Sequence, residues 1–226
     1  MRRLLVLASL VLMLAIAFTL IAQPVMAQEI EDPTGDPTVP FLEQWQGSAH
    51  AAFDTEPFRH WDEDDPAEVP TGCAKCHSSP GYLDYLGADG TEANVVDNPA
   101  PIDTVIDCVA CHNDVTLVKD SVIMPSGIEL TGLGDESRCM ECHQGRQSTV
   151  SVNESIAAAG VEDDTVSEDL GFANIHYYPA AATKYGTEAK GGYEFEGKSY
   201  DGFFAHVDGY ETCIDCHNSH TLEVKI

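Results

Sequence analysis

Four short segments of the chain share one order of thiol and imidazole groups. Each segment has the form Cys-x-x-Cys-His, and together they contain all 8 cysteines of the sequence. They are CAKCH at 73–77, CVACH at 108–112, CMECH at 139–143 and CIDCH at 213–217. Disulfides in an exported chain, or zinc bound by paired CxxC motifs, would account for the cysteines. Neither explains why a histidine follows every pair, so the fifth position points to a different chemistry.

The Cys-x-x-Cys-His order is the recognised signal for covalent haem attachment. Two residues between the cysteines let one helical turn present both sulfurs to the two vinyl groups of a porphyrin. The histidine that follows then lies under the iron as its proximal ligand. The sequence therefore predicts four covalently bound haem c groups, attached through Cys73, Cys76, Cys108, Cys111, Cys139, Cys142, Cys213 and Cys216. The predicted proximal iron ligands are His77, His112, His143 and His217.

Histidines outside these motifs are the candidates for the sixth, distal position on each iron. We expect four of these five to bind iron: His50, His60, His176, His206 and His220. His220 is the expected spare one, because it lies only three positions after a proximal ligand. Methionine is the alternative distal ligand and would raise the reduction potential, and its candidate here is Met124.

The supply of histidines also bears on the class of function. A haem enzyme needs an open coordination position for its substrate, whereas enough histidines are present here to close every iron. An iron whose six coordination positions are all occupied transfers electrons with little change in its coordination geometry. The sequence therefore predicts an electron-transfer protein with no catalytic residues. A small multihaem reductase acting on nitrogen or sulfur oxyanions is the alternative, and it would require one high-spin haem.

The N-terminal segment has the layout of a secretory signal. Arg2 and Arg3 precede an apolar run, and small residues end it at Ala27. We expect a cleaved signal peptide at 1–27, with a retained membrane anchor as the alternative. An acidic, proline-rich arm at 28–40 and a single tetrahaem cytochrome c domain at 41–226 complete the expected organisation. The mature protein is then secreted, without a membrane span.

The chain is strongly acidic, with 38 Asp and Glu against 11 Lys and Arg and a formal net charge of −27. This charge excludes nucleic acid as an expected partner and disfavours anionic lipid. Basic redox proteins and cations are more suitable partners for a chain of this charge. The same charge makes copies of the chain repel one another, so any assembly of copies has to overcome that repulsion.

The spacing of the motifs leaves little chain between them for a conventional core. We expect a mostly irregular, loop-rich fold with a few short helices and small β-hairpins, in which the haems form the core. The longest interval carries helix signals at 151–160 and at 179–186. Alternation around a glycine predicts a hairpin at 193–200. Short strands are expected at 114–120 and 220–226.

Beyond the four motifs, the chain resembles the extracellular tetrahaem c-type cytochrome nanowires (the filament-forming, OmcE-type family) over about residues 42 to 226. The resemblance rests on WQGSAH, FRHW, GCAKCHSSPGYLDYLGADG, MPSG, RCMECHQGR, NIHYYPAAATKYG, GGYEFEG and CHNSHTLEV. Related cytochromes that do not polymerise carry similar phrases.

The resemblance implies that every iron has two histidine ligands and that the adjacent subunit donates one of them. His50 or His60 would then be the ligand that reaches a neighbouring subunit. It further implies a homopolymer that conducts electrons outside the cell or at its surface and passes them to redox proteins or extracellular acceptors. A monomeric periplasmic electron shuttle is the alternative.

Overall fold

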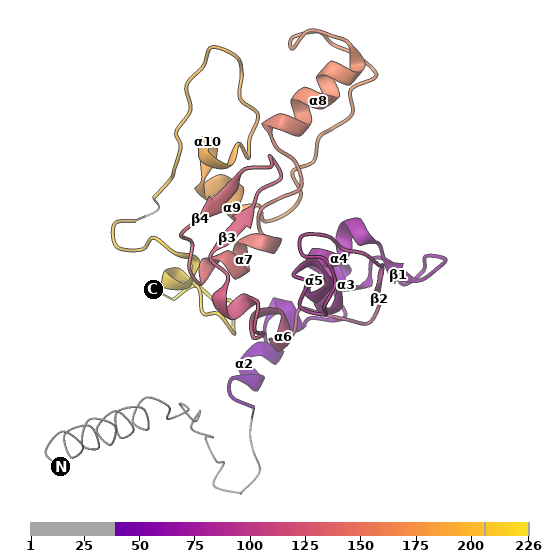
Figure 1. Cartoon of the computed structure of the whole chain (residues 1–226), viewed down its shortest axis with the longest axis vertical. Coiled ribbons are helices and arrows are strands. Elements are labelled where there is room, and N and C mark those ends of the chain that lie inside the picture. Colours follow the sequence, from indigo (N-terminus) through magenta and orange to yellow (C-terminus); the bar gives the residue numbers. More distant parts are fainter. Residues whose placement is uncertain (1–38, 206, 226) are drawn as a thin grey trace, which may run out of the picture. The chain divides into compact units, whose positions relative to one another are not determined.

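The computed structural model describes residues 39–205 and 207–225. The chain divides into two compact units, Met1–Pro40 and Phe41–Ile226, and every element below belongs to the second (Figure 1). The expected signal peptide and all but the last two residues of the arm lie outside the described residues, and so does His206. Within the described residues, no helix is both long and apolar enough to cross a membrane.

Short helices dominate this second unit. The α-helices are α2 (Leu42–Gln46), α3 (Glu56–Arg59), α4 (Thr71–His77), α5 (Ser79–Tyr85), α6 (Cys108–Cys111), α7 (Glu136–Cys142), α8 (Thr149–Ala159), α9 (Ala180–Lys184), α10 (Gly186–Ala189) and α11 (Cys213–Cys216). Two 3₁₀ turns, η1 (Ala49–Ala51) and η2 (Thr116–Val118), lie among them. The strands are β1 (Glu68–Val69), β2 (Ala100–Pro101), β3 (Ser121–Ile123) and β4 (Glu129–Thr131).

The strands form two separate antiparallel pairs. β1 pairs with β2, which places Val69 opposite Ala100. β3 and β4 form a hairpin in which Val122 lies opposite Leu130. Sheets of two short strands bury little apolar surface on one face and are marginal alone. The strands therefore depend on the helices that pack against them, above all α7 against β3.

Apolar side chains of the described residues gather in three separate clusters instead of one core. The first lies around Val122 and Leu133, the second around Phe58 and Leu86, and the third around Trp61 and Val69. Each cluster contains one residue from between the two cysteines of a motif, namely Met140, Ala110 and Ala74 in that order. Three of the motif helices, α7, α6 and α4, are thus anchored by a residue between their two cysteines, and Cys73 itself packs against the third cluster.

Helices α4 and α5 pack closely because one glycine faces α4. A Cβ atom added at Gly81 would lie 2.5 Å from Ala74 Cβ and 2.5 Å from its carbonyl oxygen. We expect Gly81→Ala to destabilise the protein by about 1–3 kcal/mol, because neither the backbone nor Ala74 has room to move away. Chemical denaturation of the purified protein, followed by circular dichroism, measures this.

Gly171 is the matched control for that substitution. A Cβ atom there would meet nothing within 4 Å, and the backbone of Gly171 does not adopt a positive φ. Gly171→Ala should therefore leave the free energy of unfolding within about 0.5 kcal/mol of the parent value. Equal effects of the two substitutions would show that the α4–α5 contact does not limit stability.

Both helices expected in the longest interval between motifs are present, with small changes in their ends. α8 begins earlier than expected, because the Ser148 side chain accepts from the backbone N–H of Ser151 and the Ser151 hydroxyl bonds back to Ser148. Gly160 ends this helix with φ 66°, in the left-handed region where glycine is favoured. α9 covers residues 180–184 of the helix expected at 179–186, and Gly186 begins α10 instead of ending α9.

The expected strand at 114–120 is wrong. Asn113 Oδ1 accepts from the backbone N–H groups of Val115 and Thr116, which turns the chain into η2 instead. The Thr116 hydroxyl then donates to the Cys111 carbonyl. A local side-chain cap has outweighed the β-branched composition of the segment.

The expected hairpin at 193–200 is present only as a turn. Lys198 N–H donates to the Phe195 carbonyl across it, at 3.2 Å. The flanking N–H groups bond to side chains, Glu194 to the Thr149 hydroxyl and Phe195 to the Tyr200 hydroxyl, so the two arms do not pair. At the C-terminus, the strand expected at 220–226 is reduced to a single bridge between His217 and Val224.

Candidate functional site

All four CxxC segments are helical. They lie within α4, α6, α7 and α11, and each following histidine is the last residue of its helix or the residue next to it. Side chains begin two of these turns: Asp107 accepts from the Val109 N–H, and Thr212 forms a capping box with Asp215. One helical turn therefore carries both thiols of each motif, as the spacing predicted.

Three of the four proximal candidates have a fixed ring orientation. The Nδ1 atoms of His77, His143 and His217 lie 2.8, 3.3 and 3.0 Å from the backbone carbonyl oxygens of Pro57, Tyr178 and Leu222 respectively. A carbonyl oxygen can only accept, so Nδ1–H donates in each bond, and in the neutral ring Nε2 is then the nitrogen that is free to bind a metal. Histidines that bind metals are held in this way by a carbonyl or carboxylate on the other nitrogen.

Three motif histidines face a second histidine. The ring centroids of His50 and His143 are 6.4 Å apart, and those of His112 and His220 are 6.2 Å apart. Those of His77 and His176 are 5.9 Å apart. Two imidazoles that share a metal, each at about 2 Å, hold their centroids about 6 Å apart. The spacing of all three pairs therefore fits an iron bound between the two rings.

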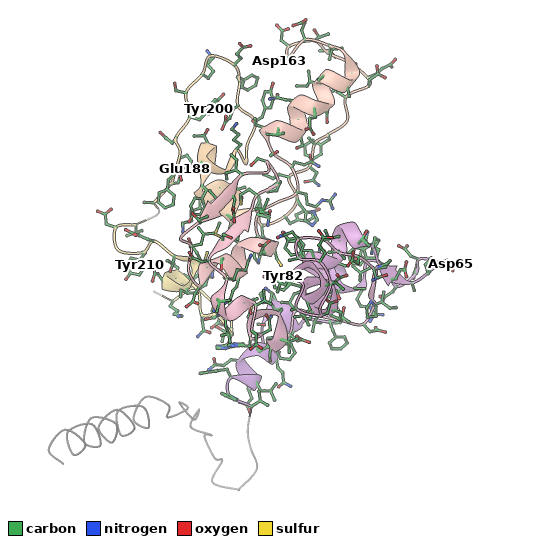
Figure 2. All side chains as sticks on the ribbon, in the orientation of Figure 1. Asp65, Tyr82, Asp163, Glu188, Tyr200 and Tyr210 are labelled. Atoms are coloured by element: carbon green, nitrogen blue, oxygen red, sulfur yellow. The ribbon has the colours of Figure 1, made fainter. Side chains whose placement is uncertain are left out.

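A second observation supports a bound group in this region. Tyr82 is buried, and its hydroxyl has no hydrogen-bond partner among the described residues. Figure 2 labels it where side chains are crowded. Burial raises the pKa of Tyr82, and the thiols of Cys142 and Cys111 act in the same direction. A buried hydroxyl donor without a partner, near two CxxCH motifs, fits a haem, because the propionate carboxylates of a haem accept hydrogen bonds.

Two of the distal candidates, His50 and His220, are held by contacts with other parts of the chain. The carbonyl of His50 accepts from Ile106 N–H, whose own carbonyl accepts from the Trp45 indole. Asn218 Oδ1 accepts from His220 N–H and turns the chain back after the last motif, and Phe41 stacks on the His220 ring at 4.4 Å. These contacts aim each ring at a motif other than the nearest one in sequence.

Burial favours the neutral form of the distal candidates. It lowers the pKa of His50 to about 4, with a further contribution from His143. The pKa values of His176 and His220 are also lowered, chiefly by burial. The neutral imidazole is the form that binds a metal, so these three side chains retain their ligand form below neutral pH.

His217 differs from the other motif histidines. Within the described residues, no second histidine ring is paired with it, and His206 lies outside those residues. His60 is the remaining candidate, and its side chain is 60% exposed. Its Nδ1 lies 2.7 Å from Glu56 Oε1, which fixes the ring as in the motif histidines and leaves Nε2 toward solvent.

Two expectations made for individual histidines concern these pairs. The ring of His220, the expected spare histidine, lies 6.2 Å from that of His112, and the ring of His50, one of the two candidates for a ligand given to a neighbour, lies 6.4 Å from that of His143 in the same chain. Which of the histidines bind iron stays a prediction. Met124 is buried with Val122 in the first apolar cluster and lies outside these ring pairs.

The motifs contact one another near their thiols. Cys142 Sγ donates to the Lys75 carbonyl at 3.7 Å, and Cys213 Sγ donates to Glu136 Oε2 at 3.6 Å. The neighbouring thiol of Cys142 lowers the pKa of Cys76, and that of Cys213 lowers the pKa of Cys139. The third motif thus touches both the first and the fourth. All eight thiols are free of disulfides. Among the described residues, no group of three or more His, Cys, Asp or Glu has the arrangement of a metal site such as structural zinc.

Two buried carboxylates join the motifs, and sequence reasoning missed both. Glu136 bonds to Lys184 Nζ at 2.6 and 2.8 Å, to the Tyr185 hydroxyl and to the Cys213 N–H. It therefore ties α7 to α9 and α11. Glu141 lies 2.7 Å from Lys75 Nζ and 2.7 Å from Lys119 Nζ, and so ties α7 to α4. Nothing in the sequence pattern marks these two among 38 acidic residues.

The chain matches no protein-family model, and no curated protein or solved structure was found to be similar to it.

Proposed function

We propose that this protein is a tetrahaem c-type cytochrome that carries electrons through closely spaced haems with two histidine ligands each. The observation that carries the proposal is the set of three opposed imidazole pairs, each combining a CxxCH histidine with a histidine from a distant part of the chain. Neither disulfide formation nor zinc binding requires such pairs.

The pairs support the following proposed ligands for three irons. The first haem would be held by Cys73 and Cys76, with His77 and His176 on its two faces. The second would be held by Cys108 and Cys111, with His112 and His220. The third would be held by Cys139 and Cys142, with His143 and His50. The fourth would be held by Cys213 and Cys216, with His217 on one face.

The bound haem would supply a one-electron carrier that changes little in shape between its two redox states. The chain's own contribution is to hold the rings and to keep water from the iron. The carbonyls of Pro57, Tyr178 and Leu222 hold three proximal rings in the tautomer that leaves Nε2 free. With both faces closed, substrate has no place to bind, so electron transfer is favoured over catalysis.

The fourth iron, at His217, would have no second histidine among the described residues, and this bears on assembly. We propose that His60 of an adjacent subunit closes it, so that chains join into a filament that conducts electrons outside the cell. The exposed, pre-oriented ring of His60 supports this assignment. A monomeric periplasmic shuttle, with His206 closing the same iron within one chain, is the competing form. Redox proteins or extracellular acceptors are the partners in either case.

The experiment that tests the proposal is a spectroscopic count of haems. The full chain is produced in a host that attaches haem c, and its mass and electron paramagnetic resonance spectrum are recorded. We expect four covalently attached haems, all low-spin in the assembled protein. A colourless protein, or one that binds zinc instead, would contradict the cytochrome proposal. One high-spin haem that binds carbon monoxide in the assembled protein would favour a multihaem reductase.

A further inference from the structure

One segment of the chain contacts the third motif and also carries the histidine that faces the first. We call residues 174–181 the strap; they run from the loop before α9 into its first turn. The Ala181 N–H donates to the His143 carbonyl at 2.9 Å, and the Arg146 N–H donates to the Ile175 carbonyl at 2.9 Å. The strap is therefore joined through its backbone to both ends of the stretch 143–146 that follows α7.

The strap also reaches histidine side chains of two motifs. Its Tyr178 carbonyl lies 3.3 Å from His143 Nδ1, on the proximal candidate of the third motif, and accepts the Ala180 N–H as well. Two positions earlier, the ring of His176 faces His77 of the first motif, with the centroids 5.9 Å apart. A single short segment thus supplies the distal candidate at the first motif and orients the proximal candidate at the third.

The strap is held in a backbone conformation that its residues do not favour. His176 has φ 81° and Tyr178 has φ 51°, both in the left-handed region, where residues other than glycine are strained. Asn174 Oδ1 accepts the His176 N–H at 2.8 Å, and Ile175 packs against the first apolar cluster. Strained residues keep such a conformation only where the surroundings fix it. The strap therefore depends on the sum of its attachments, and a bond from His176 to iron would be one of them.

Gly145 lets the strap approach the third motif closely. Its φ is 82°, and a Cβ atom there would lie 2.9 Å from Ile175 Cγ1, 3.0 Å from the Ile175 carbonyl oxygen and 3.2 Å from Pro179 Cβ. A larger residue at this position would push the strap away. Gly145 and His176 also line one cavity together with His77. The wall of the cavity at the first motif is thus built partly from the strap and partly from the end of the third motif.

We propose that the strap couples these two sites, so that His176 on the first iron keeps the Tyr178 carbonyl on His143 and thereby lowers the reduction potential of the third haem. This inference rests on the proposed function. A hydrogen bond at Nδ1 makes an imidazole a more basic ligand, which favours the ferric form of the iron that it binds. Release of His176 lets the strap leave its strained conformation, and the potential of the third haem then rises. The coupling is reciprocal, because moving the strap away from His143 equally weakens the bond of His176.

The first test removes the attachment at the first motif and measures the third. His176→Ala in the holoprotein should speed amide exchange at Arg146 and Ala181, whose N–H groups join the strap to the third motif. His220→Ala is the matched control, because it removes a distal candidate from another motif and leaves the strap intact. Mass spectrometry of peptic fragments measures the exchange.

The same substitution should raise the potential of the third haem. His50→Met marks that haem, because a methionine ligand raises the potential of the haem that it binds. In this background, adding His176→Ala should increase the reduced-to-oxidised ratio at the marked step about tenfold, the low end of what a partner of a metal ligand contributes. That factor is about 59 mV for one electron. Spectroelectrochemical titration measures it, and adding His220→Ala should leave the marked step in place.

The second test moves the strap at the third motif and measures the first. Gly145→Ala should convert one haem in four to a high-spin form that binds about one equivalent of carbon monoxide, because His176 moves away with the strap. Gly127→Ala is the matched control, since Gly127 has the same φ of 82° but a Cβ atom there meets nothing within 4 Å. It imposes the same backbone strain and should leave every haem low-spin.

Changes at both motifs that are absent from the controls support the proposal. Unchanged amide exchange or an unmoved marked step in His176→Ala would overturn it, and so would equal effects of a variant and its control, which indicate general loosening. If Gly145→Ala folds with four low-spin haems, the coupling is wrong; if it does not fold, the His176→Ala result decides alone. A parent protein without four low-spin haems in its assembled form would instead refute the proposed function, so the two failures are distinguishable.

Discussion

Replacing His220 by alanine is expected to convert one haem in four from low-spin to high-spin. His220 faces His112 across 6.2 Å with ring planes 3° apart, and Phe41 holds it there by stacking. Without this imidazole, the second iron keeps one protein ligand and its other face is open to water or carbon monoxide. Electron paramagnetic resonance and carbon monoxide titration of the reduced protein measure the change, with about one equivalent of carbon monoxide bound per chain.

His220→Met is the control for that substitution. Methionine still offers a ligand, so this variant should stay fully low-spin while one of the four reduction potentials rises. A protein that remains entirely low-spin after His220→Ala would contradict the pairing with His112. In that case His220 would be the spare histidine, as its position in the sequence suggests.

Replacing His60 by alanine is expected to abolish filaments and leave single subunits. In our proposal this side chain provides the iron ligand that joins neighbouring chains, and its loss removes a coordination bond from every junction. Repulsion between chains of formal charge −27 then acts against the remaining contacts. Electron microscopy of filaments sheared from cells measures the effect, and mass spectrometry should still find four haems on each subunit.

His206→Ala is the matched control, because it removes the other candidate ligand of the fourth iron. Filaments should persist in this variant, and the fourth haem should remain low-spin. The reverse pattern would assign the fourth iron to His206 and leave His60 as the spare. Compact single subunits from the parent protein, at any salt concentration, would favour the periplasmic shuttle and leave the haem assignments in place.

The His220→Ala and His60→Ala substitutions test two separate questions, haem ligation within one chain and haem ligation between chains. His220 tests whether the imidazole pairs within one chain are metal ligands, and it does not depend on assembly. His60 tests whether a ligand passes between chains, and it presupposes that the haems are bound. A failure of the second with success of the first would change the proposed assembly and keep the proposed electron carrier.

Local features of the structure were predictable because they depend on residues close together in the chain. The helical turn at each CxxC motif, the helix ended by Gly160 and the helix after Pro179 all follow from spacing and caps. Predictions failed where a side chain from the same loop or from elsewhere took the backbone hydrogen bonds. Asn113 did so at 114–120, and Thr149 did so at 193–200.

The sequence by itself determined where the four motifs lie, that each forms a single turn of helix, and which histidines are available to face them. Only the tertiary structure decided which histidine faces which motif, because those partners lie far apart along the chain and are brought together by packing. It also decided that Glu136 and Glu141, among many similar residues, are buried at the third motif with the basic residues around them. The net charge counted from the sequence describes the whole chain, whereas the electrostatic potential at one site depends on the few charged residues that folding places beside that site.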